Sequence, residues 1–164
     1  MNTLDEKYMN EAIILAKEAA LDDEAPIGAV IVRDGVIVGR GRNRREKDKN
    51  ALGHAEIEAI YDACNALGGW RLIGCTMYVT LEPCPMCAGA IINSRIERVV
   101  FGAYDKKAGS CGSVVNLFDL PYNHKPLLSG GFMEGECASM LSDFFKKLRK
   151  NKCQKDVQEQ ISEE

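Results

Sequence analysis

The chain has 164 residues, of which 46% are hydrophobic and 27% charged, and its formal net charge is −3. This length and hydrophobic fraction fit one globular domain with a full core. Residues 1–7 are polar, and no apolar run behind them is long enough for a signal peptide or a membrane span, so we expect a cytoplasmic protein with no membrane partner. Seven cysteines at irregular spacing exclude a regular disulfide framework and favour a reducing compartment.

The first third of the chain predicts a helix followed by a hairpin. Apolar residues at helical spacing predict an amphipathic helix over residues 3–21. Two β-rich runs, Ile27–Arg33 and Val36–Arg42, flank the dipeptide Asp34-Gly35, which is a strong signal for a hairpin turn. The next segment, 43–53, is polar and aperiodic, and we expect a loop there.

The middle of the chain alternates between helix and strand. A helix is predicted to begin at His54 and to bury a stripe of larger apolar side chains, namely Ile57, Ile60, Tyr61, Cys64 and Leu67. It is followed by a strand at Thr76–Leu81, a helix at Cys84–Asn93 and a strand at Glu97–Gly102. This alternation implies βα crossovers and a mostly parallel sheet behind the hairpin.

The last third is less regular. Its predicted elements are a loop at 104–112, a short helix at 113–118, a weak strand at 127–132 and a long final helix that includes residues 137–148. Residues 156–164 are polar, and we expect a frayed tail there. No repeat or linker divides the chain, so residues 1–155 are predicted to form a single domain.

Two short motifs carry the chemistry. Cys84 and Cys87 are three residues apart behind Pro83, which suits a first helical position, so both thiols can reach one metal ion. His54 supplies a third ligand. Three protein ligands leave a fourth position for water, as catalytic zinc sites do. Glu56 then remains for acid–base chemistry, and H-x-E followed by P-C-x-x-C is the signature of zinc nucleobase deaminases.

Simpler interpretations exist for each half of this pattern. A C-x-x-C pair alone is also found in redox sites, in structural zinc ribbons and in ordinary cores. A zinc-stabilised RNA-binding module without catalysis would use the same three ligands. That hypothesis leaves Glu56 and the open fourth position without a role. The two halves together therefore favour a catalytic site.

The pattern also indicates a reaction. Both motifs lie at predicted helix N-termini, where unpaired N–H groups and the helix dipole favour thiolates and other anions. Zinc lowers the pKa of a bound water to about 7. Glu56 would take a proton from that water and deliver protons to a ring nitrogen and the departing amine. The result is hydrolytic deamination of a heterocycle that the motif alone does not specify.

Beyond these motifs, the chain resembles the bacterial tRNA-specific adenosine deaminases from about residue 4 to about residue 150. The resemblance is densest from 78 to 103. It rests on the segments Pro26–Val30, Asn43-Arg44, His54–Glu56, Tyr78–Cys84, Met86–Ala90, Ser94–Ile96, Val99–Ala103 and Asp143–Phe145. Asn50–Gly53 and Tyr104 depart from the residues that are more familiar at those positions in the family.

The resemblance implies a three-layer α/β/α cytidine-deaminase-like fold with a mixed sheet of about five strands. It implies conversion of adenosine to inosine at the wobble position of a tRNA anticodon stem-loop by a homodimer. It implies one zinc ion per chain and proton transfer by Glu56, with the metal held by His54, Cys84 and Cys87. Substrate contacts are implied for Pro26, Ile27, Asn43 and the backbone around Ala55. DNA is not expected as a natural substrate.

The nearest rival function is deamination of a free base or nucleoside, such as guanine or cytosine. Two groups of basic residues favour the RNA substrate, because a small substrate does not require them. They are Arg40, Arg42, Arg44, Arg45, Lys47 and Lys49 in the first group, and Lys146, Lys147, Arg149, Lys150, Lys152 and Lys155 in the second. Charge runs of this kind are also common on solvated surfaces that bind nothing.

Two polar residues have alternative interpretations. Asn43 is either a base contact or a turn residue that ends a strand. Asp105 follows a predicted strand at the side of an open sheet where ligands bind. It could accept a hydrogen bond from a ribose 2′-hydroxyl, the group that distinguishes RNA from DNA. It could equally be a turn aspartate that caps its own loop.

Overall fold

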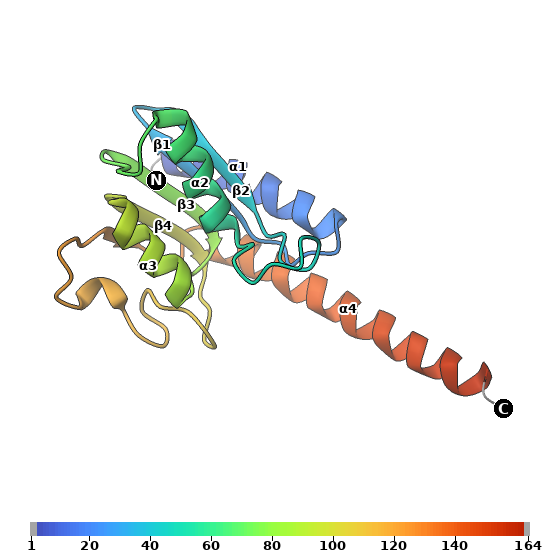
Figure 1. The fold of residues 1–164 in the computed structure, drawn as a ribbon. Coiled ribbons are helices and arrows are strands. Elements are labelled where there is room, and N and C mark those ends of the chain that lie inside the picture. Colours follow the sequence, from blue (N-terminus) through green and yellow to red (C-terminus); the bar gives the residue numbers. More distant parts are fainter. Residues whose placement is uncertain (1–2, 163–164) are drawn as a thin grey trace.

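A computed structural model describes residues 3–162 and has three layers (Figure 1). A five-stranded sheet lies between α1 and α4 on one face and α2 and α3 on the other. The helices are α1 (Thr3–Leu21), α2 (Ala55–Leu67), α3 (Pro85–Ser94), α4 (Glu134–Ser162) and the short 3-10 helix η1 (Leu117–Asp119). The strands are β1 (Gly28–Arg33), β2 (Val36–Arg42), β3 (Cys75–Leu81), β4 (Arg98–Ala103) and β5 (Leu127–Ser129). The predicted fold class is confirmed.

The sheet is mixed, with strand order β2-β1-β3-β4-β5. β1 pairs antiparallel with both β2 and β3, while β3, β4 and β5 are mutually parallel neighbours. The predicted hairpin turn is present, since Asp34 and Gly35 both adopt positive φ, as a tight two-residue turn requires. The carboxyl ends of β3 and β4 lie at one edge, and the chain leaves both strands there.

α2 lies unusually close to the sheet, and this contact sets the position of the residues at its start. A Cβ at Gly41 would lie 2.1 Å from the carbonyl oxygen of Ala55, and one at Gly39 would lie 2.3 Å from that of Ala59. The helix therefore turns its small side chains to β2. Its fully buried residues are Ala55, Ala59 and Ala63, joined by Glu56.

The predicted buried stripe of α2 is confirmed only in part, because Ile60, Cys64 and Leu67 pack against the core but Tyr61 does not. Tyr61 is 72% exposed, and Cys64 and Leu67 are only half-buried. The prediction assigned the larger apolar side chains to the core. Backbone contact with two glycines instead requires alanines at the centre of the interface, so the larger apolar side chains are only partly buried beside it.

The start of α3 also differs from the prediction. Pro85, and not Pro83, occupies the first helical turn, and Cys84 is the extended N-cap residue with φ −73° and ψ 174°. A residue that precedes proline is disfavoured in helical backbone geometry, so the helix cannot begin before Pro85. The two thiols consequently lie at the N-cap and in the first turn.

The C-terminal elements differ from the predictions in length. The helix expected at 113–118 is reduced to η1, and the last strand ends at Ser129, directly before Gly130. α4 continues to Ser162 where a frayed tail was expected from residue 156. No glycine or proline occurs between residues 136 and 162, so nothing in the sequence ends the helix. Residues 163–164 of the expected tail lie outside the described residues.

Across residues 3–162, no helix is long and apolar enough to cross a membrane.

Candidate active site

The imidazole of the site is presented by the N-terminus of α2. His54 is the N-cap residue, with extended backbone angles of φ −92° and ψ 148°. Its carbonyl oxygen accepts from the N–H of Glu58 at 3.1 Å, which begins the helix. Its side chain makes no capping hydrogen bond, so the ring is available for the site.

The two thiols are presented by the N-terminus of α3. Cys84 is half-buried, whereas Cys87 is fully buried. The N–H of Ala88 donates to the carbonyl oxygen of Cys84 at 2.9 Å and closes the first turn. α2 and α3 pack on the same face of the sheet, so their two N-termini converge on one point.

The three predicted ligands come together with spacing that suits zinc. The Nδ1 atom of His54 lies 3.6 Å from the Sγ atom of Cys84 and 3.5 Å from that of Cys87. All three ligand atoms lie within 4.8 Å of one another. Tetrahedral zinc with ordinary Zn–S and Zn–N bonds places sulfur and nitrogen about 3.6 Å apart. The donor set therefore fits a zinc ion with three protein ligands.

The pKa values of these three residues are shifted because their side chains share protons through hydrogen bonds. The hydrogen bond from Cys87, followed by the one from His54, lowers the pKa of Cys84 to about 4. The same contact with Cys84, together with burial, raises the pKa of Cys87. The hydrogen bond with Cys84 also raises the pKa of His54. A bound cation replaces these shared protons when the ligands deprotonate.

Glu56 is a separate group beside the ligands. It is 4% exposed and lies in the first turn of α2, on the buried face of the helix. Burial is the main cause that raises the pKa of Glu56 to about 7, and the negative charge of Cys84 adds to it. A carboxyl group with a pKa near neutrality is suited to take up and release protons during turnover. The proton-transfer role of Glu56 stays a prediction from the motif.

Asn43 is buried and its amide has a fixed orientation. Its Nδ2 atom donates to Glu24 at 3.3 Å, and the carboxylate of Glu24 also accepts from the N–H of Lys47 at 2.6 Å. Both Asn43 and Glu24 are buried. Because a carboxylate only accepts, the amide nitrogen must face Glu24. Its Oδ1 atom is thereby available to a substrate donor.

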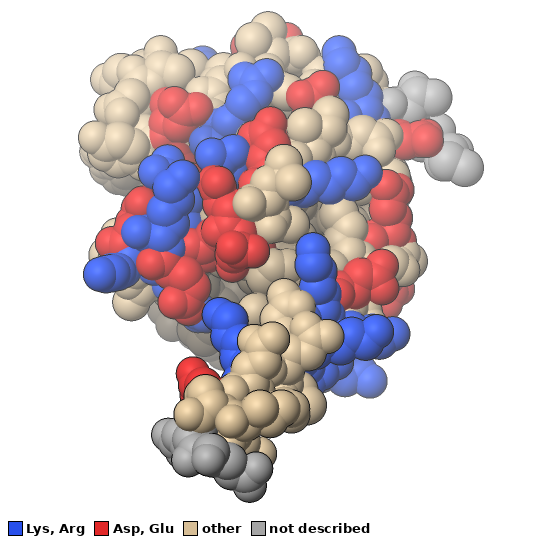
Figure 2. Space-filling view, turned by 90° about the vertical axis from the view of Figure 1, so that its right-hand side faces the viewer, with Lys and Arg blue, Asp and Glu red and all other residues tan. Residues whose placement is uncertain are grey.

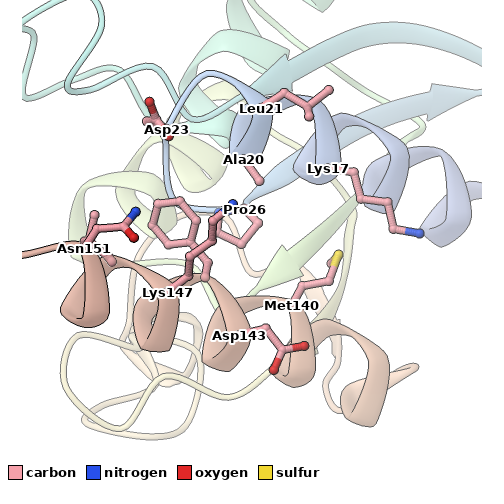
Figure 3. Close-up of a pocket in the computed structure, with 11 residues that line it drawn as sticks. Lys17, Ala20, Leu21, Asp23, Pro26, Met140, Asp143, Lys147 and Asn151 are labelled. Carbon is pink, nitrogen blue, oxygen red and sulfur yellow. The ribbon is translucent and has the colours of Figure 1, made fainter. Parts of the chain in front are cut away.

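The other predicted substrate-binding residues lie on two sides of the sheet. Ala55 is the first residue of α2, next to His54, and Ile27 packs against the core beneath α2 and α3. Pro26 instead lines a cavity of about 330 Å³ between the end of α1 and α4, where Figure 3 shows it beside Ala20 and Lys147. The structure thus brings Ala55 and Ile27 to the side of the predicted metal ligands and gives Pro26 a different environment.

Asp105 caps its own loop. Its Oδ1 atom accepts from the N–H groups of Lys107 at 3.0 Å and Ala108 at 3.3 Å. These contacts are the turn interaction that the sequence left as one alternative. The N–H of Asp105 donates to Glu82 at 2.9 Å, so the loop is anchored to the end of β3.

The two basic groups differ in their environment. Several residues of the first are paired with acids: Arg42 with Glu18 and Asp22, Arg44 with Asp48 and Glu58, and Lys47 with Asp22. The six basic residues of α4 are exposed, and among the described residues none of them forms an ion pair. In Figure 2, red and blue side chains alternate over the body, while blue side chains flank the root of the projecting helix. Unpaired basic residues are thus clustered between Lys146 and Lys155 of α4.

Comparison with known proteins agrees with this geometry. Residues 3–149 match the model of the MafB19-like deaminases. The tRNA-specific adenosine deaminase of Bacillus subtilis strain 168 is 53% identical over 151 residues, which cover 92% of this chain and 94% of that protein. This chain belongs to the tRNA-specific adenosine deaminase family.

Two solved structures place the chain within the wider fold. A structure described in work on A-to-I editing by tRNA A34 deaminases is 44% identical, has a TM-score of 0.80, and covers 83% of this chain and 99% of its own. The guanine deaminase of Bacillus subtilis is 33% identical, with a TM-score of 0.60, over 88% of this chain and 93% of that one. Both the sequence and the structure are more similar to the tRNA enzyme.

Sequence reasoning missed two buried carboxylates that organise the loops around the site. Glu24 is 1% exposed and fixes Asn43, and Glu82 is 1% exposed and anchors the loop that contains Asp105. Glu82 gave a usable signal, since it is a lone charge at the end of the apolar run 77–81. Glu24 lies in a polar loop and gave none.

Proposed function

We propose that this protein is a zinc-dependent hydrolase that converts adenosine to inosine at the wobble position of a tRNA anticodon. The observation that carries the proposal is the open three-ligand group formed by His54, Cys84 and Cys87, with buried Glu56 beside it. A structural zinc site closes its coordination with four protein ligands. In a chain 53% identical to a tRNA-specific adenosine deaminase, an open site next to a proton carrier supports deamination.

Zinc held by these three residues would supply Lewis-acid activation of a water molecule. The other steps belong to the protein. Glu56 accepts a proton from the attacking water and passes it to the ring nitrogen N1. It then takes the second proton from the hydroxyl group that has added to the carbon and passes it to the amine, which departs as ammonia. The amine-bearing carbon becomes a carbonyl, which is the change from adenosine to inosine.

Binding of the base falls to groups on the same side of the sheet. Asn43 offers Oδ1 as an acceptor, because its nitrogen is taken by Glu24. The backbone of Ala55 lies at the start of α2 beside the ligands, and Ile27 supplies apolar surface. These residues orient the base so that its amine faces the proton carrier.

The RNA stem-loop requires a larger surface than this pocket. The unpaired basic residues of α4 provide positive charge for phosphate contacts. A single chain of 18.1 kDa offers little further surface of that kind, and we infer a symmetric homodimer in which each tRNA contacts both protomers. Light scattering that finds only an 18.1 kDa particle at micromolar concentration would refute the dimer. We also propose that the protein acts in the cytoplasm, because its proposed substrate is a tRNA.

The second candidate is a guanine deaminase, favoured by the 33% identity to such an enzyme. One experiment separates the two. Purified protein is incubated with a tRNA that carries an unmodified wobble adenosine and, in parallel, with guanine, cytidine and adenosine. We expect inosine at the wobble position and no ammonia from the small molecules. Ammonia from guanine, with no inosine in the tRNA, would replace the proposal by its rival.

A further inference from the structure

Glu82 is the most heavily hydrogen-bonded side chain around the site. It follows β3 directly, is 1% exposed and precedes Cys84 by two residues. Its Oε1 atom accepts from the N–H groups of Cys111 at 3.1 Å and Ser113 at 2.9 Å. Its Oε2 atom accepts from the N–H of Asp105 at 2.9 Å and from the hydroxyl of Ser113. One carboxylate thus receives four donors from a single loop.

The loop, residues 104–113, closes tightly around this carboxylate. Gly109 approaches so closely that a Cβ there would lie 2.4 Å from the carboxyl carbon of Glu82. The N–H of Ser110 donates to the carbonyl oxygen of Pro83 at 2.8 Å, which joins the loop to the residue before Cys84. The loop is therefore tied twice to the segment that carries the metal ligands.

Burying a charged carboxylate costs more free energy than a purely structural link between loop and strand requires. Moving a carboxylate out of water is unfavourable by several kcal/mol unless donors replace its hydration. An ordinary turn could be fixed by neutral backbone hydrogen bonds, as the loop already does within itself between Gly109 and Asp105. A central anion instead holds residues 105, 111 and 113 at fixed positions relative to one another and to Cys84.

The position of the loop indicates what the anchoring accomplishes. The loop begins at the carboxyl end of β4, at the same edge of the sheet where β3 leads to Cys84 and Cys87. Substrates of open α/β sheets bind beyond that edge. Tyr104, at the start of the loop, is 47% exposed, and Lys106 and Lys107 are exposed beside it. Aromatic and cationic side chains on an ordered loop are suited to unstacked bases and their phosphates.

We infer that Glu82 is a positioning residue that holds the 104–113 loop in the conformation that binds the nucleotides next to the target adenosine. The inference rests on the proposed tRNA substrate. Glu82 acts on affinity for the RNA, through the loop, and takes no part in proton transfer. The same anchoring explains why a buried charged residue directly follows β3.

The test replaces Glu82 by glutamine, which keeps the shape but turns one of the two acceptor atoms into a donor that faces N–H groups. We expect KM for an anticodon stem-loop to rise about tenfold, because hydrogen bonds to a charged acceptor are strong ones. We expect kcat to change less than about twofold, with about one zinc per chain retained. Amide hydrogen exchange in residues 104–113 should accelerate.

Two further variants complete the design. Glu97→Gln is the matched control, because Glu97 accepts one backbone hydrogen bond from Gly74 at the opposite end of β3 and β4, and it should leave KM unchanged. Ser113→Ala removes only the hydroxyl donor and should raise KM about threefold. If Glu82→Gln does not fold, Ser113→Ala decides the question, and an unchanged KM overturns the inference.

The remaining outcomes are distinct. Unchanged KM and unchanged loop exchange in Glu82→Gln would overturn the inference. So would a loss of zinc and kcat with KM unchanged, because Glu82 would then only support Cys84. If the unaltered protein makes no inosine, the proposed function fails, whereas loop exchange without RNA still reports whether Glu82 anchors the loop.

Discussion

Two buried glutamates lie within two residues of the predicted metal ligands, and their pKa values are shifted in opposite directions. Glu56 follows His54 and is 4% exposed, while Glu82 precedes Cys84 and is 1% exposed. Burial raises the pKa of Glu56 to about 7. Burial acts in the same direction on Glu82, but hydrogen bonds from Ser113, Asp105 and Cys111 outweigh it and lower the pKa of Glu82 below its usual value.

Burial alone therefore does not assign a role to a carboxyl group. A group whose ionised form is stabilised by several fixed donors stays charged and serves as an anchor. A group whose pKa lies near neutrality can gain and lose a proton in each turnover. On this account Glu56 governs the chemical step and Glu82 governs the loop, and the following substitutions test that division.

The largest effect is expected from removal of a metal ligand. Cys84→Ala leaves two protein ligands, so the chain should lose zinc and its turnover should fall by a factor on the order of 10³ or more. Metal analysis and inosine formation on the same preparation check both. Cys153→Ala, at an exposed position on α4, is the control and should retain both. A Cys84→Ala protein with full zinc would remove Cys84 from the ligand set.

The next effect is expected at the proton carrier. Glu56→Gln keeps the shape of the side chain but cannot carry a proton, so turnover should fall by about 10²–10⁴ with about one zinc per chain retained. Glu58→Gln lies on the same helix, two residues further on, and should stay within about threefold of the parent. Zinc lost together with activity in Glu56→Gln would indicate that Glu56 is a ligand.

A smaller and salt-dependent effect is expected on α4. The variant replaces Lys146, Lys147, Arg149 and Lys150 by glutamine. If all four residues contact phosphates, the slope of log affinity for tRNA against log salt concentration should become less steep by about 3. Zinc content should not change. Arg33→Gln with Arg71→Gln, at the far end of the sheet, should leave the slope as it is. An unchanged slope in the α4 variant would make these residues an ordinary solvated surface.

The smallest effect is expected at Asp105. Asn in its place keeps the loop-capping oxygen but loses the charge, so a hydrogen bond to a ribose 2′-hydroxyl should weaken. The ratio of deamination rates for RNA and DNA stem-loops should fall severalfold, with zinc retained. An unaltered ratio would leave Asp105 with the turn contacts to Lys107 and Ala108 alone.

The sequence predicted those parts of the site that are determined locally. His54, Glu56, Cys84 and Cys87 lie in two short motifs whose spacing fixes their geometry, and the structure brings the three ligands together. The hairpin at Asp34-Gly35 was equally local, because its turn depends on two adjacent residues.

Features that depend on distant contacts were not predictable in the same way. The buried face of α2 is set by Gly39 and Gly41 of another element, and helical periodicity carries no information about them. The charges of Arg42 and Lys47 are neutralised by Glu18 and Asp22, which are twenty or more residues away. The anchoring by Glu82 requires knowledge of where residues 105–113 fold back.

The most direct test of the division between the two glutamates is a single set of kinetics on one anticodon stem-loop. kcat, KM and zinc content are measured for the parent, Glu56→Gln and Glu82→Gln. We expect Glu56→Gln to lower kcat and leave KM unchanged. We expect Glu82→Gln to raise KM and leave kcat nearly unchanged, and both variants should retain about one zinc per chain. The same pattern in both variants, whether in kcat or in KM, would contradict this division.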